Sequence, residues 1–105
     1  MSKYRAVPVV IDGRRFHSQK EGRRYRELLL LQKAGEIRDL ECQVGFPIFV
    51  HGHKISVYVA DFKFITPDGK IVVEDVKSPA TAKIALYRIK KKLVKACYNI
   101  DILET

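Results

Sequence analysis

Residues 57–77 constrain the fold most, because they have the pattern of a β-hairpin whose register can be counted from its turn. Both arms, 57–65 and 71–77, are rich in the β-branched and aromatic residues that favour strands. Between them, Pro67-Asp68-Gly69 matches a type I turn followed by a residue in the left-handed region. This is the three-residue hairpin loop with a glycine bulge, and it leaves residues 66 and 70 facing each other.

Counting back from this loop places two acidic residues opposite each other. Paired residues project to one face of a sheet, so Asp61, Asp75 and Lys77 are expected on one face and Glu74 on the other. A two-residue turn at 68–69 would separate the two carboxylates by pairing Asp61 with Val76 instead, but a proline at position 67 favours the first register. The predicted pairs are Ile65 with Ile71, Lys63 with Val73, and Asp61 with Asp75, with Lys77 opposite Val59.

Carboxylates paired in this way, with Cβ atoms about 5 Å apart, repel each other and normally destabilise a sheet. A divalent cation would remove the repulsion, and oxygen ligands suit Mg²⁺ or Mn²⁺. The alternative is that Asp61 and Asp75 lie at a wet sheet edge, where each carboxylate is solvated separately. The hairpin alone leaves both interpretations open.

The charge balance indicates a polyanionic partner. The chain has 105 residues, with 20 Lys and Arg against 12 Asp and Glu and a net charge of +8, which suggests nucleic acid or an anionic membrane surface. No run approaches a membrane span and no signal-peptide pattern is seen, so a cytoplasmic protein without a membrane partner is expected. The length suits a single domain, 1–105. Cys42 and Cys97 lack metal-ligand spacing and are expected to be reduced.

The N-terminal third predicts a ribbon and a helix. Residues 9–16 form two short strand-like runs around Asp12-Gly13, a two-residue hairpin turn. Ser18, with Glu21 three residues later, matches a capping box and opens a helix over 18–34. At 100° per residue, Glu21 falls on the stripe of this helix that should pack against the sheet. Glu21 therefore serves as a helix cap, as a site residue, or as both.

Strand patterns complete the expected architecture. Residues 36–44 and 46–50 read as strands, and Pro47 is typical of an edge strand or a bulge. A turn over 51–54 leads into the central hairpin, and 99–103 alternates like a closing strand. The expected fold is α/β: a mixed sheet of four to five strands flanked by two helices, with an N-terminal β-hairpin.

A second helix is expected from about Thr81 to Cys97, after the Ser78-Pro79 break. A basic helix face is commonly only solvated, but residues 83–95 contain six Lys and Arg and no acid, which favours phosphate binding. The expected buried stripe is Ala82, Leu86, Ile89, Leu93 and Ala96. The outward side holds Arg88, Lys91, Lys92 and Lys95, and Lys83, Tyr87 and Lys90 flank the stripe.

In chain order these residues resemble the PD-(D/E)xK nuclease superfamily. More closely, the chain is similar to small phage-encoded proteins that are grouped with the Holliday-junction resolvases of that superfamily. The resemblance spans most of the domain, although Ala60 stands where the superfamily's name has proline. It is carried by Phe16–Glu21 with Arg24-Tyr25, by Tyr58–Phe62, by Val73–Lys77, and by Tyr87 and Lys90.

This resemblance implies a restriction-endonuclease-like fold and an Mg²⁺-dependent endonuclease that hydrolyses DNA phosphodiester bonds, with Mn²⁺ able to substitute. The metal ligands would be Glu21, Asp61, Asp75 and the carbonyl of Val76. Lys77 would complete the catalytic set by orienting or deprotonating the attacking water, or by stabilising the transition-state charge. The DNA backbone would be held by Arg24, Lys83, Tyr87, Arg88, Lys90 and Lys91.

The implied substrate is branched or double-stranded DNA in phage recombination or replication, in the host cytoplasm. One alternative is a non-catalytic nucleic-acid-binding accessory protein that retains the nuclease fold, which suits the charge equally well. Another is a nuclease acting on linear ends, nicks or flaps. Junction resolution requires two paired cuts, so it predicts a homodimer with two-fold symmetry.

Overall fold

The computed structural model describes residues 7–105, and for Pro79 the backbone alone. A four-stranded sheet has the order β3-β4-β5-β6, antiparallel except for the parallel pair β5–β6. These strands are β3 (Arg38–Val50), β4 (His53–Ile65), β5 (Ile71–Asp75) and β6 (Ile102–Glu104). The other elements are the ribbon β1 (Val9–Ile11) and β2 (Arg14–Phe16) and the helices α1 (Gln19–Lys33), α2 (Pro79–Ala82) and α3 (Ala85–Tyr98). This confirms the α/β fold with a mixed sheet and an N-terminal hairpin.

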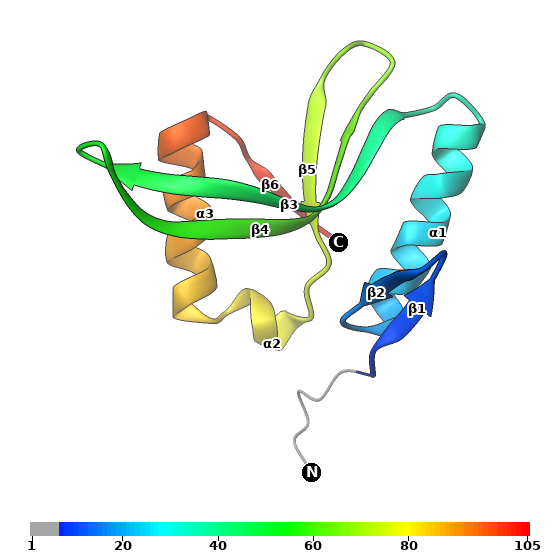
Figure 1. Cartoon of the computed structure of the whole chain (residues 1–105), viewed down its shortest axis with the longest axis horizontal. Coiled ribbons are helices and arrows are strands. Elements are labelled where there is room, and N and C mark those ends of the chain that lie inside the picture. Colours follow the sequence, from blue (N-terminus) through cyan, green and yellow to red (C-terminus); the bar gives the residue numbers. More distant parts are fainter. Residues whose placement is uncertain (1–6) are drawn as a thin grey trace.

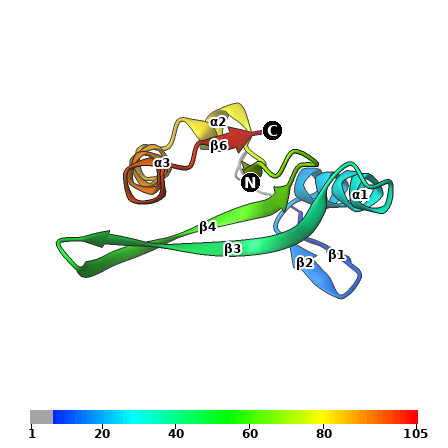
Figure 2. The same cartoon turned by 90° about the horizontal axis from the view of Figure 1, so that it is seen from above.

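The β3–β4 hairpin is the longest element, with 13 residues in each strand. Figures 1 and 2 show α3 lying across its distal half and α1 beside its other end. The core is accordingly divided into two clusters. Tyr58 and Ala60 of β4 pack in the α3 cluster, and Phe62 and Phe64 pack in the α1 cluster. Asp61 lies between the two clusters, at the point where the strand passes from one to the other.

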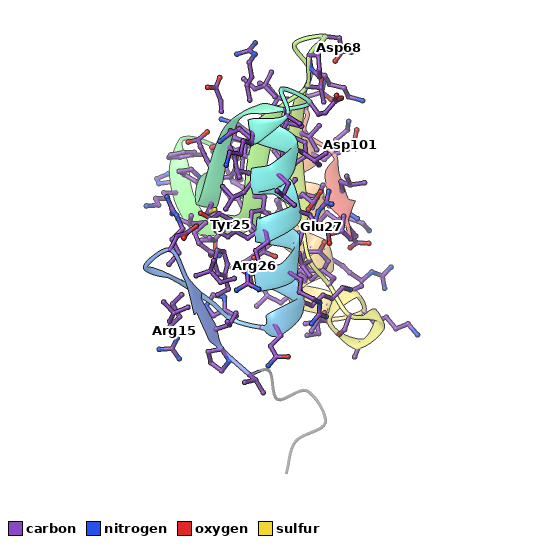
Figure 3. All side chains as sticks on the ribbon, turned by 90° about the vertical axis from the view of Figure 1, so that its right-hand side faces the viewer. Arg15, Tyr25, Arg26, Glu27, Asp68 and Asp101 are labelled. Atoms are coloured by element: carbon purple, nitrogen blue, oxygen red, sulfur yellow. The ribbon has the colours of Figure 1, made fainter. Side chains whose placement is uncertain are left out.

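Helix α1 is held close to the ribbon and the sheet by one buried stripe. Glu21, Gly22, Tyr25 and Leu28 are its buried residues, at the spacing of a single helix face. A Cβ on Gly22 would lie 2.7 Å from Cγ1 of Val9, so only glycine permits this approach of the ribbon. In Figure 3, which looks onto α1, the exposed side chains of Arg26 and Glu27 extend from the outer surface of the helix.

The central hairpin has the register that its turn predicts. Ile65 pairs with Ile71 and Lys63 with Val73, the Thr66 amide donates to the Lys70 carbonyl at 2.9 Å, and Gly69 has a φ of +84°. Pro47 lies in β3, which is the edge strand of the sheet, as expected for proline.

The predicted strand over 71–77 is two residues too long. β5 ends at Asp75, and Lys77 does not lie opposite Val59 because the chain turns from β4 toward β6 at this point. The Lys77 amide donates to the carbonyl of Thr105 at 3.1 Å, and the Thr105 amide donates to the carbonyl of Asp75 at 2.9 Å. The antiparallel ladder with β4 thus ends at Glu74, while backbone hydrogen bonds to the end of the chain continue on the other side of β5.

The predicted helix over 81–97 is interrupted, and its predicted buried stripe is wrong. Ile84 is extended (φ −65°, ψ 126°) and separates α2 from α3. Leu86 is 63% exposed and Ile89 is 56% exposed, whereas Val94 is fully buried. The aromatic residues of α3 determine this orientation, because Tyr87 packs against Tyr58 of the sheet and Tyr98 against Phe46, and large rings bury more apolar surface than aliphatic side chains.

Across residues 7–105, no helix is both long enough and apolar enough to span a bilayer.

Candidate functional site

The two aspartates of the central hairpin are locked together where β4 and β5 separate. The backbone N–H of Asp61 donates to Oδ1 of Asp75 at 2.9 Å. In return, the N–H of Val76 donates to Oδ2 of Asp61 at 2.8 Å. Each carboxylate therefore accepts from the strand that carries the other, in place of the next hydrogen bonds of the ladder. The predicted register does bring Asp61 and Asp75 together.

One unpaired residue of β3 faces this pair. The ladder between β3 and β4 passes from Cys42–Phe62 to Val44–Ala60 in unchanged register, but Gln43 is not paired with Asp61. Gln43 has a φ of +54°, a region that disfavours any residue with a Cβ. Its Nε2 donates to Oε1 of Glu21 at 2.8 Å. Gln43 thus joins the edge strand to the acidic residue of α1.

Glu21 fulfils only half of the capping box that its spacing predicts. The Glu21 amide donates to Oγ of Ser18 at 3.1 Å, so the serine caps α1. The carboxylate instead accepts from Gln43, and His17 Nδ1 lies 3.8 Å from its Oε2. Glu21 is only 4% exposed, and burial, followed by the negative charge of Asp61, raises the pKa of its carboxyl group. The negative charge of Asp61 therefore acts on the carboxyl group of Glu21.

Burial dominates the electrostatics of the aspartate pair. It raises the pKa of both Asp61 and Asp75, although the hydrogen bond that each accepts from a backbone amide and the ammonium of Lys77 act in the opposite direction. Asp75 is 1% exposed, and its Oδ2 is a buried oxygen without a hydrogen-bond partner among the described residues. A buried oxygen of this kind costs free energy unless something binds it.

Lys77 and Tyr87 border the aspartate pair on the α3 side. Lys77 Nζ lies 4.6 Å from the centroid of the Tyr87 ring, a cation–π geometry. The Tyr87 hydroxyl donates to Glu104 at 2.7 Å, and burial and Glu104 together raise the pKa of Tyr87. From α1, Nζ of Lys20 donates to the carbonyl of Lys77 at 3.0 Å. These contacts hold the segment after β5 between both helices.

Arg24, predicted to hold DNA, is engaged in a buried ion pair. Its Nε and NH2 groups donate to the two carboxylate oxygens of Glu74 at 2.7 and 2.8 Å, and NH1 donates to Glu27 at 3.1 Å. Glu74 is fully buried and is also within 3.4 Å of the Thr105 hydroxyl. The structure thus gives Arg24 the role of fixing α1 to β5, which positions Glu21 relative to Asp75.

The other predicted DNA-binding residues lie on or beside α3. Arg88 and Lys91 line a groove between α3 and β6 together with Lys92 and Lys95. Two acids of β6 and the preceding segment partly neutralise it, because Lys91 pairs with Glu104 at 3.4 Å and Lys95 with Asp101 at 2.9 Å. Lys83 is exposed at the end of α2, and neither Lys83 nor Lys90 is among the described residues that line the groove.

The donor set suits a hard cation with few protein ligands. Within residues 7–105, no group of three or more His, Cys, Asp or Glu side chains is arranged to hold a metal ion. Mg²⁺, however, is commonly held by one or two carboxylates and completes its shell with waters. Asp61 and Asp75 fit that pattern, because each has one oxygen engaged by a backbone amide and Oδ2 of Asp75 is buried without a partner among the described residues. Coordination by the carbonyl of Val76 stays a prediction.

Sequence reasoning missed the residues that support the site rather than form it. Gln43 contacts Glu21, and Lys20 contacts the carbonyl of Lys77. Glu74 accepts from Arg24, and Glu104 accepts from Tyr87. The placement of Glu74 on the opposite face from Asp75 was a usable signal, since a buried acid requires a partner. The left-handed conformation of Gln43 left no signal in the sequence, because glutamine is not a residue that marks this region.

Replacing Gln43 by Gly should impair the position of Glu21 with little change in the free energy of unfolding. Glycine relieves about 1 kcal/mol of left-handed strain, but the hydrogen bond to Glu21, worth about 1 kcal/mol, is lost. We therefore expect the free energy of unfolding to stay within about 1 kcal/mol of wild type, while the metal-dependent cleavage that the sequence predicts falls about 10- to 100-fold, as for other groups that orient a ligand. Thermal melting and cleavage rates measure the two effects.

The matched control is Asp39→Gly, since Asp39 is the other residue of β3 with a positive φ (+56°). Asp39 pairs only with the exposed Arg38, at 3.0 Å. This variant should be as stable as wild type or more stable, with unchanged activity. Equal activity losses in both variants would show that β3 distortion, not the Gln43–Glu21 contact, matters.

Comparison with known proteins places the chain in a family without assigning a reaction. No curated protein and no solved structure matches the chain. Residues 1–103 match the family described as "Protein of unknown function (DUF1064)". Because this match covers nearly all of the 105 residues, the chain belongs to the DUF1064 family.

Proposed function

We propose that this protein is a metal-dependent endonuclease of the PD-(D/E)xK type that hydrolyses phosphodiester bonds in DNA. The observation that carries the proposal is the interlocked pair Asp61–Asp75, with its buried, partnerless Asp75 Oδ2. A pair of desolvated carboxylates is unfavourable for a purely structural role, because both pKa values are raised by burial. A bound cation would offset that cost.

Each residue of the site has a role that its position supports. Asp61 and Asp75 would hold Mg²⁺, or Mn²⁺ in its place, and Glu21 would approach from α1, directly or through water. A bound divalent ion lowers the pKa of an attacking water and neutralises the scissile phosphate. Lys77, two residues after the end of β5, would donate to the attacking water or to a phosphate oxygen. Gln43 and the Arg24–Glu74 pair would keep Glu21 and Asp75 in place.

The charge distribution supports DNA as the polyanion. The chain carries a net charge of +8, and the α3 groove gathers Arg88, Lys91, Lys92 and Lys95 on a helix that follows the aspartate strand. Phosphate contacts of this kind position a substrate without reading its sequence. Branched DNA, such as a four-way junction, is the proposed substrate class.

The test is cleavage of matched DNA substrates by the purified protein. A four-way junction, a flap, a nicked duplex and a linear duplex of the same sequence are incubated with Mg²⁺, with Mn²⁺ or with a chelator. We expect cleavage with either metal and none with chelator, and faster cleavage of the junction than of the linear duplex. Tight binding of every substrate with no cleavage would instead indicate a non-catalytic accessory protein, and preference for ends, nicks or flaps would change the substrate class.

The basic groove predicts a specific salt dependence. Replacing Lys92 by Gln should weaken DNA binding uniformly across substrates and reduce the slope of log K against log salt by about 1 for each phosphate that the variant no longer binds. Binding isotherms at four or five salt concentrations measure the slope. Arg26→Gln is the control, because Arg26 is exposed on the outer surface of α1 (Figure 3), and its slope should match wild type. An unchanged slope for Lys92→Gln would show that Lys92 does not contact DNA phosphates and would contradict DNA binding at this groove.

A further inference from the structure

One side of α3 is apolar and uncovered. Leu86 and Ile89 are 63% and 56% exposed, and they are followed by the half-buried Leu93 and the exposed Ala96. These four residues, called the α3 seam, are the part of the predicted buried stripe that lies on α3. Leu86 and Ile89 stay exposed because Tyr87 and Val94 occupy the side of α3 that faces the sheet, whereas Leu93 packs in part against the core.

The spacing of the α3 seam is typical of contact between two helices. The intervals from Leu86 to Ile89, Leu93 and Ala96 are three, four and three residues, which is the a/d pattern of a helix that packs along another helix. A strand or a flat surface does not require this spacing. Among the described residues no helix takes this place, since α1 contacts the opposite end of the β3–β4 hairpin (Figure 1).

The hairpin tip extends the apolar surface. Phe49 and Val50 are 49% and 43% exposed, and they form one depression with Leu93, Ala96, Cys97 and Tyr98 at the C-terminal end of α3. The exposed parts of Leu86, Ile89, Phe49, Val50 and Tyr98 together amount to on the order of 500 Å², which is in the range of about 300–600 Å² of the largest apolar patch on a monomer, a patch that is often functional. It is also close to the apolar share of the roughly 800 Å² per partner that a specific dimer buries.

Charge excludes DNA as the occupant of this surface. The α3 residues of the basic groove, Arg88, Lys91, Lys92 and Lys95, lie between about 80° and 180° around the helix from the centre of the α3 seam. The seam itself contains no charged residue, and phosphate binding requires cations. α3 therefore has separate sides for a polyanion and for an apolar partner, and the two can be occupied at once.

We propose that two copies of this chain associate through the α3 seam, with the hairpin tips completing the interface. A second copy supplies a helix with the same spacing, and a two-fold contact matches the seam with itself. The inference rests on exposure and spacing, not on the proposed nuclease activity. In combination with that activity, it would give one particle two Asp61–Asp75 pairs related by symmetry, as paired cuts on a junction require.

The test is the oligomeric state of the full chain, freed of nucleic acid, by sedimentation over a wide range of protein concentration and at low and high salt. We expect a dimer that high salt does not dissociate, because screening weakens charge interactions but not apolar association. Ile89→Glu and, independently, Leu86→Glu should raise the dimer dissociation constant at least about 100-fold, since each would bury an unpaired charge. Both residues are exposed in the monomer, so its melting temperature should change little.

Two control variants carry the same change on other exposed apolar residues. Leu30→Glu lies on α1, where Leu30 is 68% exposed, and Val59→Glu lies on the open face of the hairpin, where Val59 is 51% exposed. Both should remain dimeric. A wild-type protein that is monomeric throughout, or a dimer that Leu30→Glu or Val59→Glu dissociates while both seam variants do not, would overturn the inference. Cleavage assays on the same preparations report on the nuclease proposal separately.

Discussion

An Asp75→Asn protein should lose Mg²⁺-dependent DNA cleavage and yet be more stable than wild type when no metal is present. In the wild-type protein the Asp61 amide donates to Oδ1 of Asp75 at 2.9 Å. Asparagine retains this acceptor, so the link between β4 and β5 should survive. The variant lacks the charged oxygen that would hold the metal. We expect cleavage to fall at least about 1,000-fold, equivalent to about 4 kcal/mol of transition-state stabilisation.

The stability gain follows from the direction of the pKa shifts. Burial raises the pKa of Glu21, Asp61 and Asp75 in the folded state, so the folded protein binds protons more tightly than the unfolded chain. Their contribution to stability is fully present below the ordinary carboxyl pKa of about 4 and is lost as pH rises through the raised values. Metal-free wild type should therefore melt at a lower temperature at pH 7 than at pH 5.

Asp75→Asn should flatten this pH dependence, and added Mg²⁺ should stabilise wild type at pH 7 but not the variant. Asp12→Asn is the control, because Asp12 lies in the exposed β1–β2 turn with a φ of +52°, a conformation that asparagine tolerates. It should leave cleavage and the pH profile unchanged. Retained cleavage by folded Asp75→Asn protein would refute the catalytic assignment.

Replacing Arg24 by Met should be the most destabilising single change at an ion pair among the described residues. The guanidinium donates to both oxygens of Glu74, and Glu74 is fully buried. Without Arg24 the carboxylate would remain in the interior unpaired, which costs about 3–5 kcal/mol. That is a large part of the roughly 5–15 kcal/mol by which a domain is stable. Urea or thermal unfolding monitored by circular dichroism measures the loss.

The double variant Arg24→Met with Glu74→Met tests the reason for the loss. It removes both charges, so the free energy of unfolding should return to within about 1–2 kcal/mol of wild type. Lys95→Met is the exposed counterpart: Lys95 pairs with Asp101 at 2.9 Å, and its removal should cost at most about 1 kcal/mol. If Arg24→Met were no worse than Lys95→Met, the Arg24–Glu74 pair would not be what holds α1 to β5.

Local turn chemistry accounts for what could be predicted of the fold. The left-handed Gly69 and the pairs Ile65–Ile71 and Lys63–Val73 follow from Pro67-Asp68-Gly69. The same turn brings Asp61 beside Asp75. Helix spacing likewise places Glu21 on the buried side of α1. These features depend on residues close in sequence, where backbone preferences are strong.

The errors come from competition between distant segments. The end of β5 at Asp75 cannot be seen in the sequence, because the chain there is hydrogen-bonded to Thr105, 30 residues later. The α3 stripe is misassigned because Tyr87 and Tyr98 find aromatic partners in the sheet, which periodicity alone does not reveal. The ion pair of Arg24 is hidden in the same way, since its buried partner Glu74 is 50 positions away.

A crystal of the protein soaked in Mn²⁺ would show directly whether Asp61 and Asp75 bind a metal ion, because anomalous scattering locates the ion without reference to activity. We predict a single strong peak between Asp61 and Asp75, beside Oδ2 of Asp75, that disappears in Asp75→Asn crystals. No peak at this pair in crystals of a protein whose DNA cleavage requires Mn²⁺, or a peak bound by other side chains, would contradict the account.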